Sequence, residues 1–250
     1  MELTAAVRSD RGLVRETNQD TYLVLRSPHN DQLLVAVADG MGGAQGGEVA
    51  SQMAIDALIR RATGMWQLTA PQQRMAWLLE SVAAANQEIY SRASIDERLR
   101  GMGTTLTAAF CAAESIIVAH VGDSRAYLFQ EGSVRQLTTD HSLVQQLIDG
   151  HQLSEEEAAV HPQRNILTRA VGVEPSVEID CAQHAWSPGD ILLLCTDGLT
   201  HVLQPPALQE ALQLGSVEHI CHALIERTLQ AGAPDNVTVL AVQNGDRSSS

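Results

Sequence analysis

The feature that most constrains the fold of this chain is a short apolar run that has an aspartate at one end and recurs along the sequence. It first occurs in LLVAVADGMGGAQGGE (33–48), where Asp39 follows the apolar residues. The same design recurs at Asp197 in ILLLCTDG (191–198), at Asp123 in IIVAHVGD (116–123) and at Asp235 in DNVTVLAV (235–242). Apolar runs of this length between turn residues are typical of buried strands. The pattern therefore predicts four buried strands, each with an aspartate at one end.

These aspartates have two interpretations. A single aspartate at a strand end is commonly a turn former or a helix cap. Four of them favour a metal site, because a hard divalent cation takes clustered carboxylate and carbonyl oxygens as ligands. Unpaired carboxylates that cluster without a cation would repel one another strongly. We therefore regard Asp39 as a candidate metal ligand.

The glycines after Asp39 offer an alternative. Gly40-Met41-Gly42, between a predicted strand and a predicted helix, is compatible with a loose dinucleotide-binding loop whose amides hold a pyrophosphate. Asp39 would then place a carboxylate beside the phosphates. No acidic residue ends a second strand about 20 residues later, as that fold requires. A nucleotide-binding oxidoreductase is therefore the less supported alternative.

The order of the remaining segments predicts an α+β sandwich of some ten mainly antiparallel strands. Short strands follow one another across close turns at 106–111, 115–121, 125–130 and 133–137, which implies antiparallel pairing. Further strands are predicted at 2–8, 20–26, 177–184, 191–196 and 236–242, and helices at about 45–63, 71–98 and 216–231. The polar segment 140–165 contains a Ser154/Glu157 capping-box pattern and is a candidate lid.

Composition excludes several classes of protein. The 250 residues carry a formal net charge of −14, whereas a nucleic-acid-binding protein needs a concentrated basic surface. No apolar run is long enough to span a membrane, and the N-terminus has no signal-peptide pattern. The four cysteines, Cys111, Cys181, Cys195 and Cys221, are isolated, which favours buried free thiols in a reducing compartment. We expect a cytoplasmic monomer with one domain at 1–244 and a disordered tail at 245–250.

Eight motifs in order resemble the metal-dependent serine/threonine protein phosphatases of the 2C type (the PPM family), in particular the compact bacterial members. They are RGLVRETNQD (11–20), VADGMGG (37–43), MGTT (102–105), AHVGDSRAY (119–127), LTTDHS (137–142), LTRAVG (167–172), GDILLLCTDGL (189–199) and DNVTV (235–239). Any one of them is weak, but the ordered set is specific and covers nearly the whole chain.

This resemblance implies two antiparallel sheets flanked by helix pairs, and hydrolysis of phosphoserine and phosphothreonine in proteins by a metal-activated water. It implies two Mg²⁺ or Mn²⁺ ions held by Asp39 as the bridging ligand, the carbonyl of Gly40, Asp197 and Asp235. The other implied roles are water orientation by Asp20, phosphate binding by Arg15 and a third, weaker metal site at Asp123. From its residue type alone, Arg15 would be a solvated surface side chain, and the resemblance overrides that interpretation.

The resemblance also implies phosphorylated protein substrates, a cognate serine/threonine kinase and a substrate-selecting flap at about 142–164. The chain departs from many eukaryotic members at Met41, where those members carry a histidine that is a candidate general acid. Methionine donates no proton, so a metal-bound water or another residue such as His161 would take that role. An inactive member that serves as a regulatory binding module is the remaining alternative, and the intact Arg15, Asp39, Asp197 and Asp235 argue against it.

Overall fold

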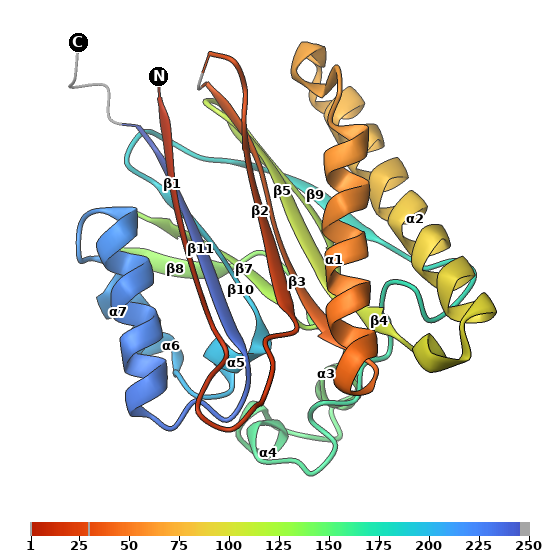
Figure 1. The fold of residues 1–250 in the computed structure, drawn as a ribbon. Helices are drawn as coiled ribbons and strands as arrows, with labels where there is room; N and C mark the ends of the chain where they lie inside the picture. Colours follow the sequence, from red (N-terminus) through yellow and green to blue (C-terminus); the bar gives the residue numbers. More distant parts are fainter. Residues whose placement is uncertain (1, 30, 246–250) are drawn as a thin grey trace.

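Two antiparallel sheets pack face to face at the centre of the molecule (Figure 1). The computed structural model describes residues 2–29 and 31–245. Sheet A has the strand order β1-β11-β10-β7-β8, and sheet B has the order β2-β3-β5-β6-β9, with the short β4 paired to β3. The strands are β1 Leu3–Asp10, β2 Asp20–Arg26, β3 Gln32–Met41, β4 Gly103–Thr104, β5 Leu106–Ala112, β6 Ser115–Val121, β7 Arg125–Gln130, β8 Ser133–Gln136, β9 Asp180–Ala185, β10 Ile191–Cys195 and β11 Val237–Asn244.

Alternation along the strands divides the core into three layers. In β3, Val35 and Val37 face the other sheet, where they share a fully buried cluster with residues of β10 such as Leu192. Leu34 and Ala36 point the opposite way, into the cluster beneath the helices of sheet B. A strand buried on both faces is apolar throughout, which explains the uninterrupted run from Leu33 to Ala38.

Helices cover the outer face of each sheet (Figure 1). The pair α1 Gly43–Arg61 and α2 Pro71–Ile95 packs on sheet B. Helices α5 Asp197–Thr200, α6 Pro205–Leu212 and α7 Val217–Gln230 cover sheet A. Two short helices, α3 Leu143–Asp149 and α4 Glu155–Ala159, lie near the ends of the strands, and single 3-10 turns occupy Met65–Gln67 and Glu97–Leu99.

The predicted α+β sandwich with helices on both faces is confirmed, and all nine strand pairings among the described residues are antiparallel. A doubly wound nucleotide-binding sheet requires parallel strands, so that alternative is excluded. The Ser154/Glu157 capping box is also present, with hydrogen bonds in both directions.

Three local expectations differ from the structure. The strand expected from residue 177 begins at Asp180, because its partner β6 ends near His120 and offers no ladder before that point. The helix expected to residue 98 ends at Ile95 and gives way to a 3-10 turn. Helix α6 was not expected, although its two N-terminal prolines and the buried Leu208 are typical helix signals.

Two further findings bear on the expectations for the ends of the chain and for membranes. Residues 246–250 of the expected tail lie outside the described part of the structure. Among the helices that are described, none has the length and apolar character needed to cross a membrane.

Candidate active site

Six of the seven predicted site residues border one cleft of about 460 Å³ at the end of the sandwich. They are Arg15, Asp39, Gly40, Asp123, Asp197 and Asp235. The seventh, Asp20, does not border the cleft but pairs with Asp39 across strands β2 and β3. Residues separated by up to 220 positions therefore meet in one place.

The sheet topology explains why the aspartates converge. Asp39 lies two residues before the end of β3, and Asp123 lies two residues after the end of β6, which runs parallel to β3 in sheet B. In sheet A, Asp197 follows β10, and Asp235 precedes the antiparallel β11. All four positions thus fall at the same end of the two packed sheets.

The glycines after Asp39 allow two backbone segments to pack closely against each other. A Cβ on Gly40 would lie 2.0 Å from the carbonyl oxygen of Gly47, and one on Gly47 would lie 2.5 Å from that of Gly40. The amide of Gly40 donates to the carbonyl of Gln19 at 3.2 Å. Only glycine fits where two backbones approach this closely, so the run packs the start of α1 against β3.

Asp20 lies behind Asp39 with one partnered and one unpartnered oxygen. Its Oδ2 accepts hydrogen bonds from the hydroxyls of Thr196 at 2.8 Å and Thr238 at 2.7 Å, both from sheet A. Its Oδ1 is buried and has no hydrogen-bond partner among the described residues. Burial raises the pKa of Asp20 to about 7, although the two hydroxyl donors act in the opposite direction.

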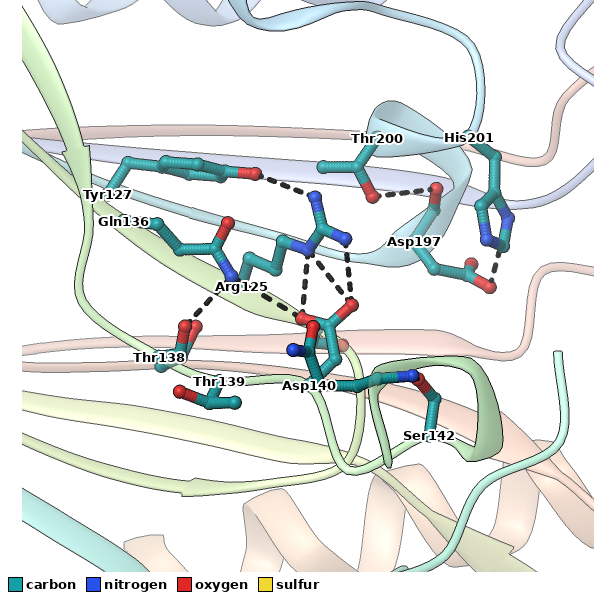
Figure 2. Close-up of polar contacts among 12 residues, drawn as sticks. Arg125, Tyr127, Gln136, Thr138, Thr139, Asp140, Ser142, Asp197, Thr200 and His201 are labelled. Carbon is teal, nitrogen blue, oxygen red and sulfur yellow. Dashed lines mark hydrogen bonds and ion pairs between the residues drawn. The ribbon is translucent and has the colours of Figure 1, made fainter. Parts of the chain in front are cut away.

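The carboxylates that face the cleft also have raised pKa values. Burial, followed by repulsion from neighbouring carboxylates, raises the pKa of Asp39 and of Asp123 well above the ordinary value. Burial also raises the pKa of Asp197, whose Oδ1 is buried without a partner and whose Oδ2 lies 3.3 Å from Nδ1 of His201 (Figure 2). Repulsion from Asp197 thus adds to the effect of burial on Asp39, so the two carboxylates oppose each other's ionisation.

Arg15 and Asp235 form an ion pair at the edge of the cleft. Nη2 of Arg15 lies 2.7 Å from Oδ2 of Asp235, while Oδ1 of Asp235 accepts the amide hydrogen of Asn236 at 2.9 Å. The hydrogen bond to Asp235 raises the pKa of Arg15. The Arg15 side chain is 54% exposed, so much of its guanidinium surface stays open to a ligand.

Asn236 is a supporting residue that sequence reasoning missed. Its Oδ1 accepts from the amide of Gln19 at 2.9 Å, and its Nδ2 donates to the carbonyls of Arg11 at 2.9 Å and Thr17 at 2.8 Å. One side chain thereby fixes the loop that carries Arg15. Its place beside Asp235 in DNVTV was the available signal, but nothing local in the sequence points to a loop more than 200 residues away.

His141 was missed as well and connects the Asp123 turn to the base of the predicted flap. Its Nδ1 accepts from the amide of Gly122 at 3.1 Å, and its own amide donates to the carbonyl of Gly122 at 2.7 Å. Its carbonyl accepts from the amide of Thr168 at 2.8 Å, and its Nε2 lies 3.2 Å from Oδ2 of Asp180. The buried ring therefore joins three segments that are distant in the sequence.

Comparison with known proteins decides the family. Residues 13–230 match the family model described as protein phosphatase 2C. The chain belongs to this family. Over 240 residues it is 40% identical to the serine/threonine phosphatase Stp of Listeria monocytogenes, an alignment that covers 96% of this chain and 95% of the relative.

Solved structures of related phosphatases support the same family assignment. The crystal structure of the Mycobacterium tuberculosis serine/threonine phosphatase PstP superposes with a TM-score of 0.88 at 39% identity, covering 98% of this chain and 100% of that one. The catalytic domain of PstP in complex with two manganese ions gives a TM-score of 0.83 at 38% identity, covering 96% and 97% of the two chains. The present chain is a serine/threonine protein phosphatase of the 2C type, and its family consists of metal-dependent hydrolases.

The donor set of this phosphatase 2C member fits hard divalent cations. Carboxylates dominate the cleft, and two buried carboxylate oxygens, on Asp20 and Asp197, have no partner among the described residues. No three or more His, Cys, Asp or Glu side chains in that part of the chain already form a ready-made ligand set. Cation binding by Asp235 would therefore have to replace its ion pair with Arg15.

Met41, which replaces the histidine of many eukaryotic members, and the candidate proton donor His161 lie differently in this phosphatase. Met41 borders the cleft, whereas His161 does not. Nδ1 of His161 instead accepts the amide hydrogen of Gln163 at 3.2 Å. The structure therefore offers no support for His161 as the general acid. The predicted flap comprises α3 and α4, and its C-terminal flank reaches the cleft through Asn165 and Leu167.

Proposed function

We propose that this phosphatase hydrolyses phosphoserine and phosphothreonine in proteins with a binuclear Mn²⁺ or Mg²⁺ centre, and that it opposes a serine/threonine kinase. The observation that carries the proposal is a cleft lined by four aspartates and an exposed arginine, with unpartnered carboxylate oxygens on Asp197 in the cleft and on Asp20 next to Asp39. Such a site combines ligands for cations with a fixed positive charge for a phosphate. The manganese complex of PstP, a relative with the same fold, supports the choice of metal.

The residues that would hold the two ions are Asp39, Asp197, Asp235 and the carbonyl of Gly40, with Asp123 as a ligand for a third ion. When bound, the ions neutralise the phosphate and activate a water molecule for attack on phosphorus. The chain's own contribution is the arrangement of the carboxylates. Asp20, held by Thr196 and Thr238, would keep its free Oδ1 directed at the centre from behind Asp39.

Arg15 would bind the phosphate group of the substrate. A guanidinium offers two parallel donors to phosphate oxygens, and this one is held on a loop fixed by Asn236. The part of the guanidinium that does not contact Asp235 is exposed and could receive the phosphate. Binding of a cation by Asp235 would release the remaining donor of Arg15 to the phosphate as well.

No side-chain nucleophile is needed for this chemistry. Cys195 is the cysteine nearest in sequence to the site, but its side chain is fully buried, and burial raises the pKa of its thiol to about 12. A cysteine phosphatase needs a thiolate at neutral pH. The reaction of cysteine-dependent phosphatases is therefore a poor fit to this site.

We further propose that residues 1–244 form one catalytic domain that acts as a monomer in the cytoplasm. The cores beneath both helix layers and between the sheets draw on the whole chain from Leu3 to Val242, which supports a single unit. All four cysteines are free, as is typical of proteins in a reducing compartment.

The test is hydrolysis of p-nitrophenyl phosphate and of a phosphothreonine peptide with EDTA, Mg²⁺ or Mn²⁺. We expect metal-dependent turnover by the wild type and its loss in Asp39→Asn. Asp56→Asn, an equivalent change on α1 outside the cleft, is the matched control and should retain full activity. Folded wild-type protein that turns over neither substrate with any metal would contradict the proposal.

A further inference from the structure

Large apolar side chains are exposed next to two segments that line the cleft. Leu13 and Val14, which are 64% and 68% exposed, directly precede Arg15. Ile166, which is 45% exposed, lies between the cleft residues Asn165 and Leu167. Single exposed apolar residues are common on protein surfaces, but these three gather within two residues of the cleft lining. We call Leu13, Val14 and Ile166 the apolar rim.

Hydrogen bonds hold the backbone of Leu13 and Val14 in place. The amide of Leu13 donates to the carbonyl of Ala233 at 2.9 Å, and Asn236 holds the carbonyls of Arg11 and Thr17. Gly12 has φ +76°, and a Cβ there would lie 2.2 Å from the carbonyl oxygen of Asp235. The loop is thus pressed against the segment before β11, and its two apolar side chains point into solvent from a preorganised position.

Ile166 is held in a similar way between the cleft residues Asn165 and Leu167. Its amide donates to the carbonyl of Gln163 at 3.1 Å, and its carbonyl accepts from the amide of Leu143 at 2.8 Å. Exposed apolar groups on preorganised backbone bind a partner with little loss of conformational entropy. Both sides of the rim therefore have the properties of a contact surface.

The position of the rim identifies the partner. A phosphorylated side chain that reaches Arg15 brings its own backbone across the border of the cleft. Consecutive Cα atoms are about 3.8 Å apart, so the one to three residues on either side of the phosphorylated residue come within reach of the rim. The rim carries no charge, although the whole chain has a formal net charge of −14 that would otherwise favour basic partners.

We propose that the apolar rim selects phosphoprotein substrates with apolar side chains next to the phosphorylated serine or threonine. This proposal rests on the phosphatase function proposed above. Contact with the rim buries apolar surface from both molecules, which stabilises the complex with the correct substrate. Because the phosphate is bound elsewhere, the rim affects peptides and not small phosphomonoesters.

The experiment compares three phosphothreonine peptides that differ only at the flanking positions, which are apolar, neutral polar or lysine. p-Nitrophenyl phosphate, which has no flanking residues, reports the chemical centre alone. The variants are the double substitution Leu13→Ser with Val14→Thr, and Ile166→Thr. Ile95→Thr is the matched control, because Ile95 is 79% exposed at the end of α2 and does not border the cleft.

We expect the wild type to hydrolyse the apolar peptide with about tenfold higher kcat/KM than the neutral polar one, mostly through KM. The double variant should lose this preference and keep its activity on p-nitrophenyl phosphate, Ile166→Thr should lose part of the preference, and Ile95→Thr should match the wild type. Equal rates on all three peptides, or a preference for lysine, would overturn the proposal. A parallel loss on p-nitrophenyl phosphate would overturn it too, because the rim would then act through Arg15.

Failure of the underlying function has a different result. If the wild type with Mn²⁺ hydrolyses none of the four substrates, the phosphatase proposal itself is wrong, and the rim proposal is overturned with it. Turnover of p-nitrophenyl phosphate without discrimination among peptides removes only the rim proposal.

Discussion

Two neighbouring groups of buried charge in this molecule are built on opposite principles. Both carboxylate oxygens of Asp140 accept hydrogen bonds from the guanidinium of Arg125, at 2.8 to 3.1 Å, and Nη1 of Arg125 donates to the hydroxyl of Tyr127 (Figure 2). By contrast, Asp39 and Asp197 both border the cleft and form no ion pair with an arginine among the described residues. One oxygen of Asp197, and one of Asp20 next to Asp39, has no hydrogen-bond partner in that part of the chain.

The difference shows which of the two groups of charged side chains stabilises the fold and which one is suited to bind a ligand. A buried ion pair with all its hydrogen bonds satisfied fixes the local structure, and the removal of one partner is costly. Buried like charges with open oxygens destabilise the fold, and proteins keep such arrangements where a ligand completes them. We therefore expect substitutions in the two groups to have opposite effects on stability and activity, which the following predictions test.

The largest effect should come from Asp197→Asn. Loss of one cation ligand removes several kcal/mol of transition-state stabilisation, so kcat/KM on a phosphothreonine peptide should fall about 10³-fold. Asp190→Asn is the matched control, because Asp190 lies just before the opposite end of β10 and accepts hydrogen bonds from Gln130 and Ser187. It should lose stability and keep kcat/KM. A similar loss of activity in both variants would contradict the role of Asp197 as a cation ligand.

The next effect concerns pH in the metal-free protein. The pKa of Asp20 in the folded state, about 7, lies above its ordinary value, so the folded state binds more protons than the unfolded state between about pH 4 and 7. This contribution to stability is present at low pH and is lost as the pH rises, at up to about 1.4 kcal/mol per pH unit. Mn²⁺ should replace the protons.

Thermal unfolding with and without Mn²⁺ from pH 5 to 7.5 measures this effect. The increase in Tm on addition of Mn²⁺ should grow with pH. An increase that does not depend on pH would contradict the assignment of raised pKa values to the cleft.

Asp140→Asn tests the satisfied group. It leaves the half-buried Arg125 without a full charge partner, so the free energy of unfolding should fall by about 1–3 kcal/mol. Below the melting temperature, kcat/KM should stay within about twofold of wild type. Asp96→Asn, which breaks the exposed contact with Arg98, is the control and should have a much smaller effect on stability. Denaturant unfolding and peptide hydrolysis measure both quantities.

The smallest effect should come from Asn236→Ala. It leaves the amide of Gln19 and the carbonyls of Arg11 and Thr17 without their side-chain partner, at a cost of about 1–3 kcal/mol. Because the loop of Arg15 then loosens, KM for a phosphopeptide should rise more than kcat falls. Asn86→Ala removes an equally buried amide that bonds Gly172 and Glu174, and should lower stability without changing KM. Equal changes in KM would contradict the role of Asn236.

The sequence permitted a correct prediction of the sandwich because each buried strand carries its own local pattern. Val35 and Leu192 belong to apolar runs bounded by turn residues, and the hairpin at Glu131-Gly132 follows from the short turn, in which both residues have positive φ. The candidate metal ligands were visible for the same reason, since Asp39 and Asp197 end such runs.

Other parts of the site could not be predicted from local patterns. Arg15 and Asp20 lie in or next to a polar loop without periodicity, so the residues alone marked them only as polar groups that could face Asp39, and the family resemblance supplied their roles. The pairing of Arg15 with Asp235 and the bonds of Asp20 to Thr196 and Thr238 form only when the two sheets pack. Helix α6 was missed because it is only eight residues long and follows another short helix.

The most direct test of the account is the melting temperature of the wild type and Asp39→Asn, each measured in EDTA and with Mn²⁺. Asp39 is repelled by Asp20, Asp197 and Asp123, and it forms no ion pair with any described residue. We expect Asp39→Asn to melt at or above the wild type in EDTA, because the substitution removes a carboxylate from among like charges, and we expect Mn²⁺ to raise the melting temperature of the wild type alone. A variant that melts lower in EDTA and is stabilised by Mn²⁺ as much as the wild type would contradict it.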